Sequence, residues 1–409
     1  MDTTYRRLFN EAYGEGLYEA YKSDLCGRLN TNFEFRLAET PVFLPAELRR
    51  RLIQSGREIL AQLCEPARFL RMRRAIPKEW DTPGMDSLPS FAQLDFAIVR
   101  NGDGLLVPRL IELQGFPSLT ALQVVQRDAW NAALQGIPGL DTEWSCWFSG
   151  MDREGFLGLA RRTILGSCDP ENVILMDLDP RSQKTYPDFV ATKLLFGVDA
   201  VCPSTLIRDG RRLLRRGADG DKRLLQVRRI YYRVVFDELL RKQVPLPFDF
   251  REELDVQWAP HPNWFWAWSK YSVPFLNHPT VPEAVLLSEI SEIPADLSDR
   301  YVLKPLFSFA GGGVNVDPRP ADIAKIPSSE RRGWCLQEKI EYAPAIPAAD
   351  GGGVKVEVRL MFLRPDDEDT PVLAQNLCRM SRGKMLGVDF NKKFTWVGSS
   401  VGLWPLATG

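Results

Sequence analysis

Residues 301–314 constrain the fold of this 409-residue chain more than any other segment. Their apolar start predicts a short β-strand that delivers Lys304, and three consecutive glycines (Gly311, Gly312 and Gly313) follow in the same segment. Glycines lack Cβ, so their N–H groups can approach a phosphate closely and their backbone tolerates positive φ. A lysine at the end of a strand supplies the positive charge that phosphate oxygens need.

The order of this lysine and these glycines excludes one phosphate-binding motif and suits another. A Walker loop has its lysine directly after the last glycine and before Ser or Thr, whereas Lys304 precedes the glycines. The order suits a nucleotide held between two sheets, with Lys304 in an open cleft. The alternative is a glycine-rich hairpin that carries an exposed lysine, and the segment alone does not decide between the two.

The composition describes an ordinary globular chain. It is 44% apolar and 26% charged with a formal net charge of −1, so neither a nucleic acid nor a membrane is predicted as a partner. Seven cysteines without a C-x-x-C pair and only two histidines argue against a zinc site, a disulfide framework or a histidine triad. No run approaches about 18 apolar residues and no signal-peptide core is present. We therefore expect a cytoplasmic protein.

Four regions follow one another along the chain. Residues 1–90 carry apolar positions at helical spacing and predict a helical region. Residues 91–150 begin with two strand-like runs around a turn, followed by a helix. Residues 151–257 alternate strand, helix and strand, which predicts a Rossmann-like module with an open parallel sheet. Residues 258–409 begin with an aromatic-rich connection and continue in short strands and turns. The predicted class is α/β (α+β).

The predicted hairpin at 91–114 places acidic groups on paired strands. Asp95 lies on the first strand and Glu112 on the second, and Gln114 shares the face of Glu112 because strand residues two apart point the same way. Two carboxylates and an amide oxygen form an oxygen-only cage, which suits Mg²⁺ bound together with substrate phosphates. The alternative is a hairpin with a charged, solvated face.

The C-terminal region supplies the remaining groups of a nucleotide pocket. Residues 334–340 form an apolar strand that ends in a polar segment, whose backbone could read an adenine edge. Residues 355–363 alternate cleanly and direct Glu357 and Arg359 to one face, and Arg379 adds a further cation. Lys270, ahead of the lysine strand, is a second candidate for phosphate binding, with a surface lysine as the alternative.

Together these segments resemble the ATP-grasp superfamily. The lysine strand with its glycines resembles the phosphate-covering flap of the family. A second segment resembles the hinge that holds adenine; it consists of Gln337, Glu338, Lys339 and Ile340. The set at 95–114 resembles the magnesium motif, an Asp followed by Glu-x-Asn. That motif normally comes last, and here it precedes the lysine strand, which resembles the circularly permuted branch that includes glutathionylspermidine synthase. Permutation requires residues 91–114 and 301–314 to meet in space.

The resemblance implies a role for each candidate residue. ATP would be bound by Lys270, Lys304, the glycines at 311–313 and the hinge at 337–340, and Mg²⁺ by the set at 95–114. Two positions depart from the family: Gln114 stands where Asn is usual, and Gln93 stands where many members place an arginine that holds the reacting intermediate. Arg359 and Arg379 are the candidates that would take over this catalytic role.

The function implied is an ATP-dependent ligase that joins a carboxylate to an amine through an acyl phosphate. Both substrates would be small molecules or peptides, and the sequence identifies neither. A kinase-like phosphotransferase and a non-catalytic ATP-binding module remain as alternatives. His261 either contacts substrate or is a structural histidine. The nine basic residues at 208–229 could form a surface that attracts anions, but a run of charges is more often a solvated face, so a solvated β-ribbon is the favoured interpretation.

Overall fold

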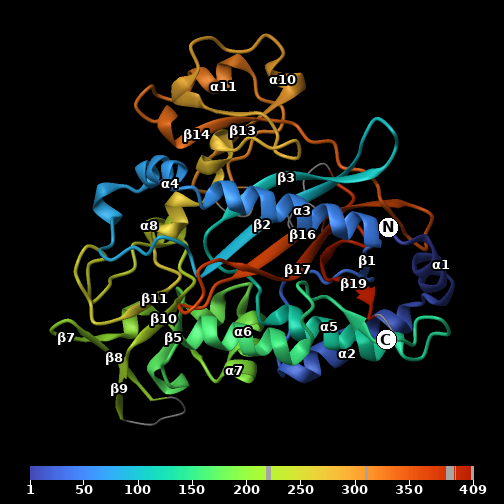
Figure 1. The fold of residues 1–409 in the computed structure, drawn as a ribbon, viewed down its shortest axis with the longest axis horizontal. Helices are drawn as coiled ribbons and strands as arrows, with labels where there is room; N and C mark the ends of the chain where they lie inside the picture. Colours follow the sequence, from blue (N-terminus) through green and yellow to red (C-terminus); the bar gives the residue numbers. More distant parts are fainter. Residues whose placement is uncertain (218–222, 309–311, 384–390, 392, 407–409) are drawn as a thin grey trace.

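The computed structural model describes residues 1–217, 223–308, 312–383, 391 and 393–406. A large antiparallel sheet runs through the middle of the molecule, and a smaller lobe that carries β13 and β14 stands above it in Figure 1. The order of strands across the large sheet is β18 (Gly398–Ser400), β17 (Val372–Ser381), β16 (Gly353–Leu363), β2 (Phe91–Arg100) and β3 (Leu106–Gln114), with β15 (Ile346–Pro347) paired to β16.

The predicted hairpin at 91–114 is confirmed as β2 and β3, and its sheet continues into the C-terminal part of the chain. β2 pairs antiparallel with β16, which places Arg359 opposite Asp95 although 264 residues separate them. β16 pairs in turn with β17, which places Glu357 opposite Arg379. Residues 91–114 and 353–381 therefore form one continuous sheet.

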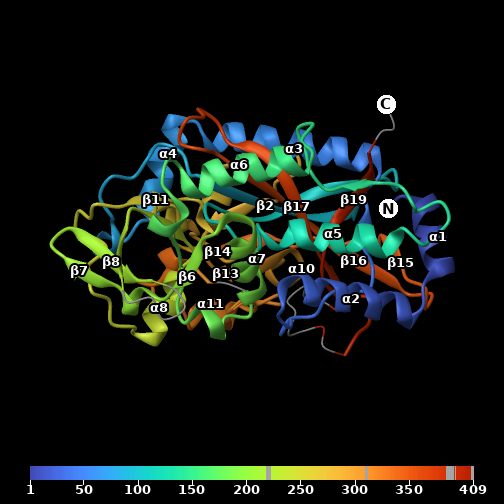
Figure 2. The same cartoon turned by 90° about the horizontal axis from the view of Figure 1, so that it is seen from below.

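Helices cover both faces of the large sheet. Figure 2 shows α3 and α6 on one side of the molecule and α2 on the other. At Gly56 of α3 an added Cβ would lie 2.6 Å from Cδ1 of Leu360 on β16, so this helix packs closely against the sheet. The predicted N-terminal helical region is found as α1 (Thr3–Ala12), α2 (Glu15–Leu29), α3 (Ala46–Leu63) and α4 (Pro66–Met72), and α5 (Leu122–Leu134) follows the hairpin.

The predicted β-α-β module is also found. Its strands are parallel because a helix crosses over between β5 and β6, and this helix ends at Gly197, whose φ of +78° fits the left-handed conformation of a helix C-cap. The strand order is β11 (Gln257–Ala259), β10 (Arg229–Tyr232), β5 (Val173–Met176) and β6 (Asp199–Val201), with α6 (Arg153–Leu165), α7 (Tyr186–Phe196) and α8 (Phe236–Lys242) beside it.

The small lobe is built on an antiparallel sheet in the order β12 (Ala284–Leu286), β14 (Trp334–Glu338) and β13 (Tyr301–Pro305), with α10 (Leu297–Arg300) and α11 (Pro320–Ala324). Its apolar cluster, which includes Leu287, Leu303 and Leu336, is separate from the main core. Two chain segments join it to the rest of the molecule, one before β12 and one after β14. The lobe is therefore a packing unit of its own.

Shorter elements complete the fold. β1 (Val42–Phe43), β19 (Gly402–Pro405) and β4 (Trp144–Ser145) form a small sheet, and α9 (Trp264–Ala267) lies in the aromatic-rich connection. The basic segment forms a ribbon of β7 (Ile207–Asp209), β8 (Arg212–Arg216) and β9 (Leu224–Val227). The 3-10 helices are η1 (Arg73–Ala75), η2 (Lys78–Trp80), η3 (Pro170–Asn172), η4 (Pro180–Ser182), η5 (Pro203–Thr205), η6 (Lys270–Phe275), η7 (Leu287–Glu289) and η8 (Arg331–Gly333). Among the described helices, none has the length and apolarity needed to cross a membrane.

Candidate functional site

The predicted acidic set lies together on one face of the hairpin. Asp95 on β2 is directly opposite Glu112 on β3, and Gln93 is opposite Gln114. The register then shifts, because Ile111 is an extra residue on β3 between the partners of Asp95 and Phe96. Such a β-bulge re-aims the local backbone. It coincides here with the acidic pair.

Asp95 is the centre of a buried ionic cluster that we call the arginine–carboxylate cluster (Asp95, Glu357, Arg359 and Arg379). Arg359 donates Nε to Oδ1 of Asp95 at 2.5 Å and Nη2 to Oδ2 at 2.6 Å. Arg379 donates to Asp95 and to Glu357, and Tyr342 donates its hydroxyl to Glu357 at 3.0 Å. Arg379 keeps a third of its side chain exposed, so one cation of the cluster reaches the surface.

The charges in this cluster shift the pKa values of its two acids in opposite directions. Burial alone would raise the pKa of Asp95, but Arg359 and Arg379 outweigh it and the pKa is lowered. The pKa of Glu357 is raised, because burial and the neighbouring charges of Asp95 and Glu112 exceed the attraction of Arg379. Asp95 is therefore the ionised partner of the two arginines.

Gln93, which stands where many ATP-grasp members place an arginine, takes part in the hydrogen bonds around this cluster. Its Oε1 accepts from Nη1 of Arg359 at 2.9 Å and from Nε2 of Gln114 at 2.8 Å. Gln114 donates a second hydrogen bond to the carbonyl of Phe116 at 3.1 Å, so the amide nitrogen of Gln114 is the donor in both of these hydrogen bonds. The neighbouring strand β16 thus supplies the guanidinium that the sequence lacks at position 93.

Lys304 of β13 reaches from the small lobe to the bulge of β3. Its Nζ donates to Oε1 of Gln337 at 3.1 Å and to the carbonyl of Ile111 at 3.4 Å. Burial lowers its pKa, while the nearby charge of Glu112 acts in the opposite sense. The expectation of an open cleft was wrong: Lys304 is only 8% exposed, because the side chain of Gln337 and the edge of β3 enclose it.

Lys270 approaches the same acid from η6. Its Nζ donates to the carbonyl of Ser308 at 2.5 Å and lies 3.8 Å from Oε2 of Glu112. A cavity of about 20 Å³ lies beside these groups and is lined by Glu112, Gln114, Lys270 and Ser308 among others. That volume holds about one water or one ion. We call Lys270, Lys304 and Glu112 the lysine–glutamate cluster.

The requirement that the two distant segments meet is therefore confirmed. Lys304 contacts a main-chain carbonyl of β3 that is 193 residues earlier in the chain, next to Glu112. Of the predicted glycines, Gly311 lies outside the described residues. Gly312 and Gly313 follow it, and Gly313 has a φ of +73° and would place a Cβ 3.0 Å from Cγ of Pro305. Gly313 therefore lies against the end of the lysine strand.

The four predicted hinge residues divide between two surroundings. Gln337 turns inward to Lys304, and its Nε2 also donates to the carbonyl of Ile111 at 3.1 Å. Glu338 pairs with Arg109 at 3.0 Å, while Lys339 and Ile340 line a separate, larger cavity. The main-chain N–H groups of Glu338 and Lys339 already donate to carbonyls of the small lobe, at 2.8 and 2.7 Å.

His261 is a structural residue. It is 4% exposed, its Nε2 lies 3.0 Å from the carbonyl of Pro83, and the N–H of Asn263 donates to its Nδ1 at 3.3 Å. Burial lowers its pKa to about 4. The neutral ring therefore ties the loop at 259–263 to the segment near Pro83.

The basic ribbon is largely neutralised by its own neighbours. Arg208 pairs with Glu252 at 2.6 Å, and Arg211 pairs with Asp255 at 3.0 Å. Arg229, at the base of the ribbon, is buried and pairs with Asp366 at 2.6 Å. These contacts support the interpretation of a solvated ribbon.

The residues present fit Mg²⁺ through part of the predicted set. Glu112 is 28% exposed beside the small cavity, and the amide oxygen of Gln114 is the atom of that side chain left over from its two donated bonds. Both oxygens of Asp95 instead accept from guanidinium groups. Among the described residues, no three His, Cys, Asp or Glu side chains are grouped to hold a metal. Ligation by Asp95 stays a prediction.

Comparison with known proteins gives a likeness at the level of the fold. No protein-family model matches the chain, and a search of the curated proteins finds no match. Among solved structures, the chain is similar to a glutathione synthetase-like effector from Globodera pallida, determined in its apo form. The two are 13% identical with a TM-score of 0.56, over 90% of this chain and 93% of the other. The predicted α/β class is thus confirmed, as a fold like that of this effector.

Proposed function

We propose that the protein is an ATP-dependent carboxylate–amine ligase with a circularly permuted ATP-grasp arrangement. The observation that carries the proposal is the convergence of Lys270, Lys304 and Glu112 from three distant segments at the junction of two sheets. The fold likeness supports it, because glutathione synthetases belong to the ATP-grasp superfamily. The low identity leaves the activity itself to experiment.

The two clusters would divide the chemistry. Lys270 and Lys304 would neutralise phosphate oxygens, and Mg²⁺ held by Glu112 and Gln114 would balance charge on the β- and γ-phosphates. A substrate carboxylate attacks the γ-phosphorus and ADP leaves, which gives an acyl phosphate. An amine then attacks the acyl carbon, and phosphate leaves while the amine loses its proton. Arg379, partly exposed beside Asp95, would stabilise the transferring group by preorganised charge.

Nucleotide entry would require the small lobe to move. The cavity at Glu112 has room for about one ion, not for a triphosphate. The bonds from Lys304 and Gln337 to the carbonyl of Ile111 are the contacts that would have to open. Lobe closure over bound substrate is a common step in phosphoryl transfer and excludes water from the reacting groups.

Two observations favour a second candidate, a nucleotide-binding protein without catalysis. Asp95, expected as a metal ligand, is held by two arginines, and Gln114 replaces the usual Asn. Such a protein would bind Mg·ATP and release no ADP. A ligase releases ADP when an acid and an amine are both supplied, whereas a kinase-like enzyme needs no amine.

Thermal unfolding with nucleotides tests the proposal first. Mg·ATP should raise the melting temperature, since a ligand at a hundredfold over its Kd adds about 2.7 kcal/mol of stability. NAD and GTP serve as matched controls. A shift with either control and none with Mg·ATP would overturn the proposal. ADP release against pools of carboxylates and amines then separates a ligase from the alternatives.

A further inference from the structure

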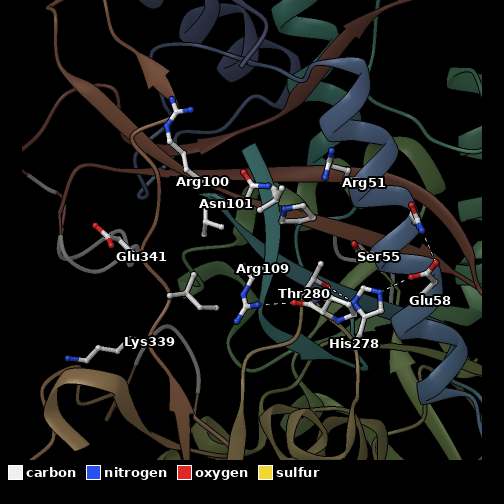
Figure 3. Close-up of a pocket in the computed structure, with 16 residues that line it drawn as sticks. Arg51, Ser55, Glu58, Arg100, Asn101, Arg109, His278, Thr280, Lys339 and Glu341 are labelled. Atoms are coloured by element: carbon white, nitrogen blue, oxygen red, sulfur yellow. Dashed lines mark hydrogen bonds and ion pairs between the residues drawn. The ribbon is translucent and has the colours of Figure 1, made fainter. Parts of the chain in front are cut away.

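A second cavity lies at the edge of β3, apart from both clusters. Its volume is about 670 Å³, and it shares no lining residue with the small cavity at Glu112. Figure 3 shows α3, with Arg51, Ser55 and Glu58, on one side and Lys339 and Glu341 on the other. The β2–β3 hairpin and residues 278–280 complete the wall. Sequence analysis did not find this cavity, because four separate segments build it.

The charged groups around this cavity are mostly cations. Its lining contains the four cations Arg51, Arg100, Arg109 and Lys339, and the two acids Glu58 and Glu341. Glu58 is engaged by Nε2 of His278 at 2.7 Å. The acids that pair with Arg51, Arg109 and Lys339 are Glu47, Glu338 and Asp317, none of which lines the cavity. A formal excess of positive charge therefore faces the cavity.

The cations keep donors for a further acceptor. The side chain of Arg51 is 32% exposed and that of Arg109 is 28% exposed. Arg109 donates Nη1 to the carbonyl of Pro279 at 2.8 Å and Nη2 to Glu338 at 3.0 Å. A guanidinium has five N–H donors, so these two bonds leave others for a carboxylate or phosphate.

Apolar side chains form the rest of the wall. They are Val99, Val107, Pro108, Pro279 and Ile340. Small-molecule sites typically enclose about 300–1,000 Å³, with an apolar lining and a few placed polar groups. This cavity has both properties, and its cations determine the polar part of the ligand.

We propose that this cavity binds a small organic anion, with an apolar body and a carboxylate or phosphate group. The apolar part would lie against Val99, Val107 and Ile340, and the acidic group would accept from Arg51 and Arg109. The cavity shares Lys339 and Ile340 with the predicted adenine hinge, and it shares no residue with the lysine–glutamate cluster. Because residues 278–280 and 339–341 flank the small lobe in the chain, a bound ligand touches both connections of that lobe.

Charge-selective labelling tests the electrostatic part. Ser55 lines the cavity and is 6% exposed, so Ser55→Cys places a thiol there with little change of shape. Its reactions with an anionic and a cationic methanethiosulfonate are followed by peptide mass mapping, which separates it from the native cysteines. Exposed Ser329→Cys is the reference. We expect the anionic-to-cationic rate ratio to be at least about tenfold higher at position 55, since a positive site concentrates anions.

Two further substitutions, each made in the Ser55→Cys protein, test whether the charge preference comes from a residue that lines the cavity. Arg51→Gln should lower the ratio measured at position 55, whereas Arg50→Gln should leave it unchanged. Arg50 and Arg51 both pair with Glu47, at 2.7 and 2.8 Å, and only Arg51 of these two lines the cavity. If Ser55→Cys does not fold, Thr280→Cys provides a second thiol in the same wall.

Protection by defined probes tests binding and separates the two acidic groups. The probes are 4-phenylbutyrate, phenyl phosphate and the neutral 4-phenylbutyramide. We expect one or both acids, and not the amide, to protect the Ser55→Cys thiol. The acid that protects better shows whether the site prefers a carboxylate or a phosphate. Equal rate ratios at positions 55 and 329, equal protection by the amide, or no protection by either acid would each overturn the proposal.

Discussion

The arginine–carboxylate cluster and the lysine–glutamate cluster adjoin at the paired residues Asp95 and Glu112 but differ in their balance of charges. In the first, two carboxylates face two guanidiniums, and every member comes from the large sheet. In the second, Lys304 from the small lobe and Lys270 from η6 lie near the carboxylate of Glu112. The first cluster has equal numbers of acids and cations, and the second has two cations and one acid among its three members.

This difference supports different roles for the two clusters: a structural role for the first, and phosphate binding, as proposed above, for the second. A buried charge without a partner is costly, so the members of the first cluster hold one another in place. In the second, carbonyl and amide oxygens of Ile111, Ser308 and Gln337 accept hydrogen bonds from the lysines. Under the proposed function, phosphate oxygens would be further acceptors.

The largest effect is expected from Asp95→Asn. It removes the ionised partner of Arg359 and Arg379 inside the sheet, and breaking a buried pair typically costs about 3–5 kcal/mol. Urea denaturation should show this loss in the free energy of unfolding. Asp103→Asn, in the exposed turn of the same hairpin, is the control and should change it by less than about 0.5 kcal/mol. Equal effects of the two variants would contradict a structural role for the cluster.

The next effect concerns nucleotide affinity. Lys304→Met keeps the length of the side chain and removes its charge, so the Kd for ATP should rise about 10- to 100-fold, the worth of a charged hydrogen bond. Titration calorimetry measures it. The fold should persist, because the variant removes a buried charge and not a packed apolar group. Lys325→Met, in the same lobe and largely exposed, should bind ATP normally. A wild-type Kd for ATP in Lys304→Met would show that Lys304 does not bind the nucleotide.

A smaller effect is expected from Glu112→Gln. The variant keeps the shape and deletes one negative charge, so ATP binding in EDTA should stay the same or strengthen. The gain in affinity on adding Mg²⁺ should shrink by about tenfold, because the metal loses its carboxylate ligand. Glu330→Gln, an exposed site on the small lobe, is the control. If Mg²⁺ strengthened ATP binding equally in the variant and the wild type, Glu112 would not be a metal ligand, and its role would be limited to its ionic interactions with the lysines.

The smallest effect is a pH dependence of stability. Burial lowers the pKa of Lys304 below its ordinary 10.5, so the unfolded chain binds more protons than the folded one between the two values. The free energy of unfolding contributed by this group therefore rises with pH across that window. Urea titrations from neutral to alkaline pH should show a steeper rise in the wild type than in Lys304→Met. Parallel curves would mean that Lys304 pays no desolvation cost.

Local patterns predicted much of the fold, and long-range pairing accounts for what they missed. The hairpin at 91–114, the lysine strand and the shared face of Glu357 and Arg359 follow from alternation and turn residues. The capture of Asp95 by Arg359 depends on the pairing of β2 with β16, which alternation does not specify. The one sequence feature that could have indicated this capture was Gln93, which stands where many family members place an arginine.

The burial of Lys304 was missed for a related reason. The strand pattern identifies the lysine, but its surroundings come from Gln337 and from a bulge on another strand. The cavity at the edge of β3 was missed because its lining is spread over four segments, each of which alone reads as an ordinary charged surface.

The position of β3 at the border of the large sheet has a consequence for solubility. An uncovered border strand is a template for pairing with another chain, and proteins usually protect it. Here the protection comes from a lobe: Leu110 donates its N–H to the carbonyl of Thr280, and Lys304 and Gln337 donate to the carbonyl of Ile111. Any movement that lifts this lobe also uncovers a strand edge. A ligand that keeps the lobe in place would therefore protect the protein against self-association as well as fill its site.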